Sequence, residues 1–175
     1  MAGHSKWAKL KHSKGKTDAQ KSKLFSKLVR FISVEAKKAK GDRSAPGLRA
    51  AIDKARAANM PADNIDRAID KASSAGELEQ VVYEAYGPGG VALIIEGYTD
   101  SRNRTAQEVK HILSKNGVEL ANPGAAAWAF AKNFEGKLGA QTTVEISDED
   151  GAKLAELVEA LEDHDDVSEV YTNAA

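Results

Sequence analysis

Lysines at regular short intervals dominate the start of the chain. The first sixteen residues place Lys6, Lys9, Lys11, Lys14 and Lys16 among small or polar neighbours. A lysine ammonium binds phosphate oxygens without reading a base sequence, so this pattern favours contact with a nucleic-acid backbone. Trp7 and His12 lie among the lysines, and their rings can stack on exposed bases. The alternative without a binding role is a solvated tail whose Trp7 packs on the helix that follows.

Charge is sorted along the chain rather than mixed. The first forty residues carry eleven Lys and one Arg against two acids, Asp18 and Glu35, whereas the whole chain has a formal net charge of −1. The remainder of the chain is therefore strongly acidic. A basic segment on an acidic body indicates a polyanionic partner, and nucleic acid is the commonest one. Because lysine favours backbone contacts over base contacts, we expect little sequence preference.

A basic helix face extends this charge. Thr17 and Gln20 have the spacing of a capping box, which predicts a helix from there to about Lys40, with Gly41 as its stop. At helical periodicity the apolar residues share one arc, and a second arc collects Lys23, Lys27, Arg30, Lys37 and Lys38. An ordinary solvated helix face is the alternative. The scarcity of acidic partners on this helix favours the binding interpretation.

Two arginines stand where the helix dipole disfavours them. Arg102 and Arg104 follow Asp100 and Ser101 at the predicted start of a later helix. They could bind phosphate together with the free amides of that helix end. They could instead pair with the acidic segment from 144 to 171, which holds eleven acids and one lysine. The sequence leaves both alternatives open.

No pattern of residues indicates catalysis or a metal. The chain has no cysteine, and none of the metal-ligand spacings connects its histidines, which are His4, His12, His111 and His164. Residues 87–90 are glycine-rich, but they lack the lysine and hydroxyl residue of a P-loop, so they predict a hairpin turn. We therefore expect a protein that is not an enzyme and needs no metal or cofactor.

The targeting signals of membrane and secreted proteins are missing from the sequence. No apolar run approaches the ~20 residues that cross a bilayer. The basic N-terminal segment lacks the apolar stretch of a secretory signal. We expect a cytoplasmic protein with no membrane partner.

The chain predicts an α+β fold in which helices come first. Helices are expected from 17 to 40, from Pro46 and from Pro61, with residues 73–76 closing this part. The later pattern predicts strands at 81–86, 91–98, 126–131, 142–146 and 167–171, and helices through Lys115 and after the N-cap Ser147. From residue 91 the order is β-α-β-β-α-β, a ferredoxin-like βαββαβ domain, to which strand 81–86 adds at one edge. The predicted organisation is a flexible basic arm (1–16), a three-helix domain (17–76) and a ferredoxin-like α/β domain (77–175).

Several sequence blocks resemble one protein family. They are GHSKW at 3–7, LRAAIDKARAANMP at 48–61, YGPGGVALIIE at 86–96, TDSRNRT at 99–105, SKNG at 114–117 and LVEALEDHDDVSEVY at 157–171. Together they resemble the YebC family, which includes bacterial proteins and a mitochondrial translational activator. Family members usually carry a further α/β domain between the two central strands of the ferredoxin-like domain. Only about 133–141 lies in that interval here, so the chain resembles a shortened member.

The resemblance implies a non-enzymatic regulator of gene expression and leaves its target open. Relatives have been described as DNA-binding transcriptional regulators and as translation factors. We favour a ribosome-associated factor that binds ribosomal RNA or tRNA, because a lysine-rich arm with a single aromatic residue suits irregular RNA. A regulator that binds duplex DNA is the first alternative. A ligand-sensing or oligomerisation module is the second, and the sequence does not set the oligomeric state.

Overall fold

The computed structural model describes residues 17–73, 77–134 and 136–175, and it divides into a helical unit and a sheet unit. The arm predicted at 1–16 lies outside the described residues. Both predicted domain limits adjoin residues that are not described, so those limits stay predictions. Among the described residues, none of the helices combines the length and the apolar character needed to cross a membrane.

The helical unit contains three α-helices, followed by the short 3-10 helix η2 (Lys71–Ser73). The α-helices are α2 (Asp18–Lys38), α3 (Pro46–Ala57) and α4 (Ala62–Asp70). The predicted capping box is confirmed, since the Gln20 amide donates to the Thr17 hydroxyl and the Thr17 amide donates to the Gln20 side chain. The α2 helix ends slightly before the predicted residue. Gly41, at a φ of 82°, donates its amide to the Ala36 carbonyl and closes the helix end.

Small and branched side chains form the core of the helical unit. On α3, Leu48, Ala51, Ile52 and Ala55 are spaced at i, i+3, i+4 and i+7 and are all buried, and α4 and η2 repeat this pattern. These faces pack against Leu28 and Ile32 of α2. Alanine at half of these positions allows the helices to approach closely. The α2 face that points inward is therefore fixed, which decides where its lysines can lie.

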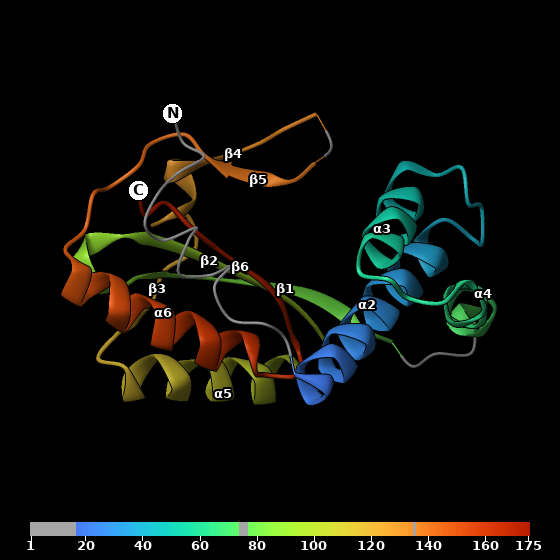
Figure 1. Cartoon of the computed structure of the whole chain (residues 1–175), viewed down its shortest axis with the longest axis horizontal. Coiled ribbons are helices and arrows are strands. Elements are labelled where there is room, and N and C mark those ends of the chain that lie inside the picture. The colour runs from blue at the N-terminus through green and yellow to red at the C-terminus, as the bar shows by residue number, and fades with distance from the viewer. Residues whose placement is uncertain (1–16, 74–76, 135) are drawn as a thin grey trace. The chain divides into compact units, whose positions relative to one another are not determined.

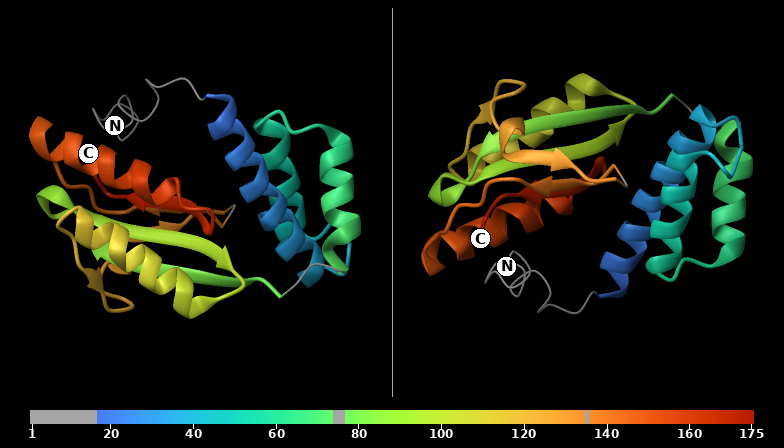
Figure 2. Two further views of the ribbon diagram at one scale, coloured as in Figure 1. Left: turned by 90° about the horizontal axis from the view of Figure 1, so that it is seen from below. Right: turned by 90° about the horizontal axis from the view of Figure 1, so that it is seen from above.

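The sheet unit is a four-stranded sheet whose order is β3-β1-β2-β6. Its strands are β1 (Glu79–Tyr86), β2 (Ala92–Thr99), β3 (Leu120–Ala121) and β6 (Val167–Thr172). Helices α5 (Arg102–Lys115) and α6 (Asp148–Glu162) cover one face, as Figure 1 and the view from below in Figure 2 show. A separate hairpin of β4 (Phe130–Lys132) and β5 (Leu138–Ala140), preceded by η4 (Ala127–Ala129), lies over the other face.

Strand β2 is buried on both faces, which explains its continuous apolar sequence. Leu93 and Ile95 pack in the cluster under α5 and α6. Ala92 and Ile94 pack on the opposite side with Phe130 of the hairpin. The sheet is thus the middle layer of three, and β2 is its central support.

The predicted α+β class is confirmed, but the place predicted for the first strand is wrong. We expected 81–86 at an edge of the sheet, whereas β1 lies between β2 and β3. The short 3-10 helix η3 (Pro88–Gly90) forms the turn, and Gly89 and Gly90 adopt positive φ there. This tight turn folds β1 directly back onto β2. The β2-α5-β3 unit is therefore split, as in a ferredoxin-like domain, but by the strand that precedes it.

Of two other predicted strands, one is shorter and displaced and the other does not form. Residues 126–129 form a turn and η4, and only Phe130–Lys132 is a strand, which pairs with β5 rather than with the main sheet. The segment 142–146 holds one isolated bridge, between Val144 and Ala174. Val144 and Ile146 are partly buried against the core, so alternating burial produced a strand-like pattern without a ladder. The N-cap predicted at Ser147 is confirmed, since its hydroxyl accepts from the Asp150 amide at 3.1 Å.

Candidate nucleic-acid interface

The predicted contacts of the basic arm lie outside the described residues. These are Lys6, Trp7, Lys9, Lys11, His12, Lys14 and Lys16. Their proposed contacts with phosphate and bases stay predictions. The sites that the structure does describe are the basic face of α2 and the start of α5.

The basic face of α2 divides into two parts. Lys23, Lys27 and Arg30 are half-buried, whereas Lys37 and Lys38 in the last turn are exposed. A shallow hollow of about 630 Å³ lies along the first half of the helix, and its lining mixes Asp18 with Lys21 and Arg30 around Phe25. The first half of α2 therefore presents mixed charge. Lys21 is exposed in this first half, and Lys37 and Lys38 are exposed together in the last turn.

Lys37 and Lys38 meet little opposing charge. The Lys38 ammonium lies 2.9 Å from Glu35, one turn earlier on the helix. For Lys37, the part of the chain that the structure describes offers no ion pair. Arg43, a few residues further along the chain, does have an acidic partner, since its guanidinium lies 2.8 Å from the Asp66 carboxylate. The helix dipole also favours cations in a last turn, so the two ammonium groups stabilise this helix end. Both side chains are exposed, so a phosphate can reach them.

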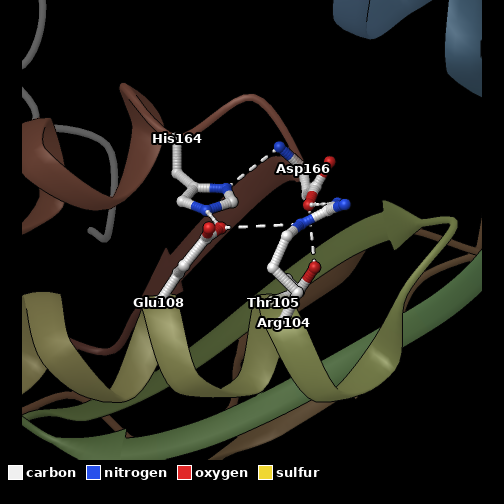
Figure 3. Close-up of polar contacts among 5 residues, drawn as sticks. All are labelled: Arg104, Thr105, Glu108, His164 and Asp166. Atoms are coloured by element: carbon white, nitrogen blue, oxygen red, sulfur yellow. Dashed lines mark hydrogen bonds and ion pairs between the residues drawn. The ribbon is translucent and has the colours of Figure 1, made fainter.

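Arg104 is held by carboxylates, as one of the two alternatives left open by the sequence expected. Its Nη2 lies 2.9 Å from Oδ2 of Asp166, and its Nε lies 3.9 Å from Oε2 of Glu108 (Figure 3). The Asp166 side chain is buried, and the Thr105 hydroxyl donates to the same Oδ2 at 2.7 Å. A buried carboxylate needs such partners, because leaving it unpaired is costly. Arg104 thus fastens the start of α5 to the segment that leads into β6.

His164 completes this group of residues. Its Nδ1 accepts the backbone amide of Asp166 at 3.0 Å, and its Nε2 lies 2.6 Å from Oε2 of Glu108. Because Nδ1 accepts a hydrogen bond, the ring proton must sit on Nε2, which donates to Glu108.

That tautomer bears on metal binding. Glu108, His164 and Asp166 offer ligand atoms that all lie within 4.8 Å of one another. A metal needs an unprotonated ring nitrogen, but here the unprotonated Nδ1 is taken by the Asp166 amide and Nε2 carries the proton. Arg104 also occupies the position beside the carboxylates where a cation would lie. The group therefore acts as a set of structural contacts rather than a metal centre.

Arg102 is exposed at the first position of α5. Burial raises the pKa of the Tyr83 hydroxyl, and the positive charge of Arg102 opposes that rise. The charge of Arg102 thus affects the titration of a β1 residue. Its contact with phosphate stays a prediction.

The sequence offered the acidic segment as a partner of Arg104 but did not identify Asp166 within it, and it missed the roles of Glu108 and His164. The usable signal was the arginine itself, because a cation at a helix N-terminus needs a compensating acid. The acidic segment from 144 to 171 offered many candidates. Only the return of the chain from α6 into β6 selects Asp166, which lies 62 residues from Arg104 in the sequence.

Comparison with known proteins assigns the family. The family model of the TACO1/YebC protein N-terminal domain matches residues 5–75, and that of the TACO1/YebC second and third domains matches 78–136 and 131–174. The chain belongs to the TACO1/YebC family. Its predicted resemblance is thereby confirmed over nearly the whole sequence.

The similar proteins include curated relatives and one crystal structure. A probable transcriptional regulatory protein of Fervidobacterium nodosum is 39% identical over 99% of this chain and 93% of its own length. A protein of the same description from Halothermothrix orenii is 47% identical over 99% of this chain and 70% of its own. The crystal structure of a conserved hypothetical protein from Aquifex aeolicus has a TM-score of 0.82 and 32% identity, covering 98% of this chain and 97% of that one.

This chain is a shortened member of the TACO1/YebC family. The alignment with the Fervidobacterium protein runs over 237 positions, whereas this chain has 175 residues, so the relative holds a long stretch without a counterpart here. The two matches to the second and third domains meet at 131–136. That is where β4 leads into the turn of the β4–β5 hairpin. The short β4–β5 hairpin therefore lies in the interval where the family resemblance predicted that a domain is missing.

Proposed function

We propose that this chain is a non-enzymatic, nucleic-acid-binding regulator of gene expression that acts on RNA at the ribosome. The observation that carries the proposal is the sorting of charge, with a strongly basic first forty residues in a chain of net charge −1. A polyanion relieves the mutual repulsion of these lysines and gains by releasing its counterions. The proposal places the protein in the cytoplasm.

The described residues support part of this interface. Lys37 and Lys38 are exposed at the end of α2, where they offer two accessible cations within the basic first forty residues. Arg104 is left out of the proposed interface, because its guanidinium is engaged by Asp166. The names of the relatives, probable transcriptional regulatory proteins, support a regulatory role in the expression of genes.

RNA is favoured over duplex DNA on chemical grounds. Lysines bind phosphates of any geometry, whereas reading duplex DNA needs side chains such as Arg, Asn or Gln placed against base edges. The first part of the chain is rich in Lys rather than in those residues. A lysine-rich segment with a single tryptophan, as in residues 1–16, suits the irregular surface of folded RNA.

Sedimentation of cell extracts tests the proposal. At low salt we expect the protein to comigrate with ribosomal particles, and the triple variant Lys6→Glu, Lys9→Glu and Lys11→Glu to leave them. A charge-matched control changes exposed lysines of α5 and α6, namely Lys110→Glu, Lys115→Glu and Lys153→Glu, and should remain with the particles. The circular-dichroism spectrum of each variant should match that of the natural sequence, which shows that the variant is folded. A protein that never sediments with ribosomal particles contradicts the ribosomal role.

A transcriptional regulator that binds duplex DNA is the second candidate, and the names of the relatives favour it. It predicts discrimination among duplex sequences by several kcal/mol, which is ~10³-fold or more in affinity. A competition assay at fixed salt measures that ratio. Equal affinity for all duplexes, together with tighter binding to RNA, rejects this candidate.

A further inference from the structure

Two aromatic side chains lie exposed together on the sheet unit. Tyr86, the last residue of β1, is 40% exposed, and Trp128 of η4 is 58% exposed. The Trp128 indole Nε1 donates to the Tyr86 hydroxyl at 2.8 Å, and that hydroxyl in turn donates to the Ala125 carbonyl. We call these two side chains the aromatic pair. The two residues are 42 positions apart in sequence, so the pair exists only in the fold.

A buried carboxylate holds the segment that carries Trp128. Glu84 lies two residues before Tyr86, on the same face of β1, and its side chain is buried. Its carboxylate accepts the backbone amides of Gly124, Ala126 and Ala127 at 2.7, 2.7 and 2.9 Å. Charge-assisted bonds of this kind are short and strong. The hydrogen bonds from this segment to Glu84 of β1 therefore hold Trp128 in position.

The core of this face does not need the indole. Ala126, Ala129 and Phe130 fill the contact with Ala92 and Ile94, and Trp128 is not part of that cluster. The polar atoms of the two aromatic side chains are used on each other and on Ala125. The chemistry left to offer is therefore the flat surface of the rings, which binds by stacking.

We propose that the aromatic pair stacks an unpaired base of a single-stranded nucleic acid. This inference rests on the proposed function and names a second contact, on the sheet unit, for the same class of ligand. Base stacking on aromatic side chains tolerates any sequence, which agrees with the weak sequence preference expected of the lysines.

The surroundings of the pair favour a base over a protein partner. The adjoining residues are small, since the chain reads Pro123-Gly124-Ala125-Ala126-Ala127 before Trp128. A stable protein interface needs ~800 Å² on each side, with an apolar centre, whereas one base needs only the area of a ring. Lys132, four residues after Trp128 in the sequence, is an exposed cation of the same segment, and a lysine ammonium binds phosphate oxygens.

The test uses tryptophan emission of the full chain. The sequence has two tryptophans, so Trp7→Phe leaves Trp128 as the single reporter while the aromatic pair stays unchanged. One ligand is a short single-stranded uridine RNA. The other is an abasic oligomer with the same number of phosphates and no bases. We expect the uridine RNA to quench Trp128 emission and the abasic oligomer to leave it unchanged, although both bind through phosphate.

A variant supplies the second measurement. Trp128→Ala should weaken binding of the uridine RNA by about 5- to 150-fold and leave binding of the abasic oligomer unchanged. Phe134→Ala removes another exposed aromatic ring, outside the pair, and should change neither affinity. If Trp128→Ala does not fold, the quenching measurement on the intact pair decides alone.

The outcomes separate this inference from the function on which it rests. Equal emission with both oligomers overturns the inference and leaves the proposed function standing, as does an equal effect of Trp128→Ala on both affinities. Failure of both oligomers to bind overturns the proposed function, and the inference with it.

Discussion

Cations lie at one end of α2 and one end of α5, and their surroundings are opposite. Lys37 and Lys38 occupy the last turn of α2, where the helix dipole favours them and Glu35 is the acid that one of them meets. Arg104 lies in the first turn of α5, where the dipole disfavours it, but Asp166 and Glu108 compensate. The basic end of α2 is stable without a partner, and its two exposed cations are part of the proposed phosphate-binding surface. The start of α5 uses its arginine to join two segments of the sheet unit.

This difference shows that an unfavourable position for a charge has two meanings. A residue placed against local preference can mark a binding site, but it can equally mark a tertiary contact that outweighs the local cost. For Arg104 the nearby buried carboxylate decides for the tertiary contact. Variants of each region should therefore separate stability from binding.

The largest effect on stability is expected at Glu84 in the sheet unit. Glu84→Gln replaces one acceptor oxygen by an amide that faces backbone N–H donors, so we expect the free energy of unfolding to fall by about 2–4 kcal/mol. Chemical denaturation measures this change. The exposed Glu119→Gln is the matched control and should change stability by less than about 0.5 kcal/mol.

The same carboxylate predicts a dependence of stability on pH. Burial raises the pKa of the Glu84 carboxyl, but three amide hydrogen bonds outweigh burial and hold that pKa below its ordinary value. A lowered pKa means that the folded state binds this proton less readily than the unfolded state. The stabilisation is therefore complete above the unfolded pKa of glutamate, about 4.3, and is lost as the pH falls through the folded pKa. A Glu84→Gln chain whose stability falls as steeply in acid as that of the natural sequence would refute this assignment.

An intermediate effect is expected at Arg104. Arg104→Ala removes a charge-assisted hydrogen bond from buried Asp166, and since the guanidinium is about half exposed we expect a loss of only about 1–2 kcal/mol. Affinity for RNA should stay the same. Lys110→Ala on the exposed side of α5 is the control and should change neither property. A loss of RNA affinity in Arg104→Ala with unchanged stability would reverse the comparison.

The smallest effect on stability is expected at the end of α2. Lys37→Ala with Lys38→Ala should lower the free energy of unfolding by less than about 1 kcal/mol, because only favourable dipole interactions and one surface ion pair are lost. RNA affinity should fall, and its salt dependence should weaken by about 0.7 in logarithmic slope for each phosphate contact removed. Lys110→Ala with Lys115→Ala removes the same charge from α5. Equal effects of the two double variants would place the binding surface elsewhere.

Local signals in the sequence predicted the helices well. Thr17, Pro46 and Ser147 each begin a helix for a reason confined to a few residues, and Gly41 and Gly117 adopt the positive φ that ends one. The alternation in β2 was hidden because both of its faces are buried, yet its apolar run still predicted a strand. The order of the predicted elements indicated the α+β class, and the family blocks indicated the missing domain.

Long-range pairing was not predictable from the same signals. Strand β3 has two residues, too few to leave a pattern, so the sequence assigned its role to 126–131. Asn173 explains why 142–146 resembled a strand without forming one. Its buried side chain accepts a hydrogen bond from the Ala92 amide and donates one to the Thr142 carbonyl. That bridge holds 142–146 in place without a ladder. The contacts around Arg104, and the pairing of Tyr86 with Trp128, likewise depend on segments that only the fold brings together.

The most direct test of the account is the salt dependence of binding. Its central claim is that the lysines of the first sixteen residues bind phosphates. For single-stranded RNA the logarithm of the association constant should fall linearly with the logarithm of the salt concentration, by about 0.7 for each phosphate engaged. The five lysines of that segment should contribute about −3 to −4 of the slope, and the Lys6→Glu, Lys9→Glu, Lys11→Glu chain should lose binding. An affinity that does not change with salt, or that survives the triple substitution, would contradict the claim.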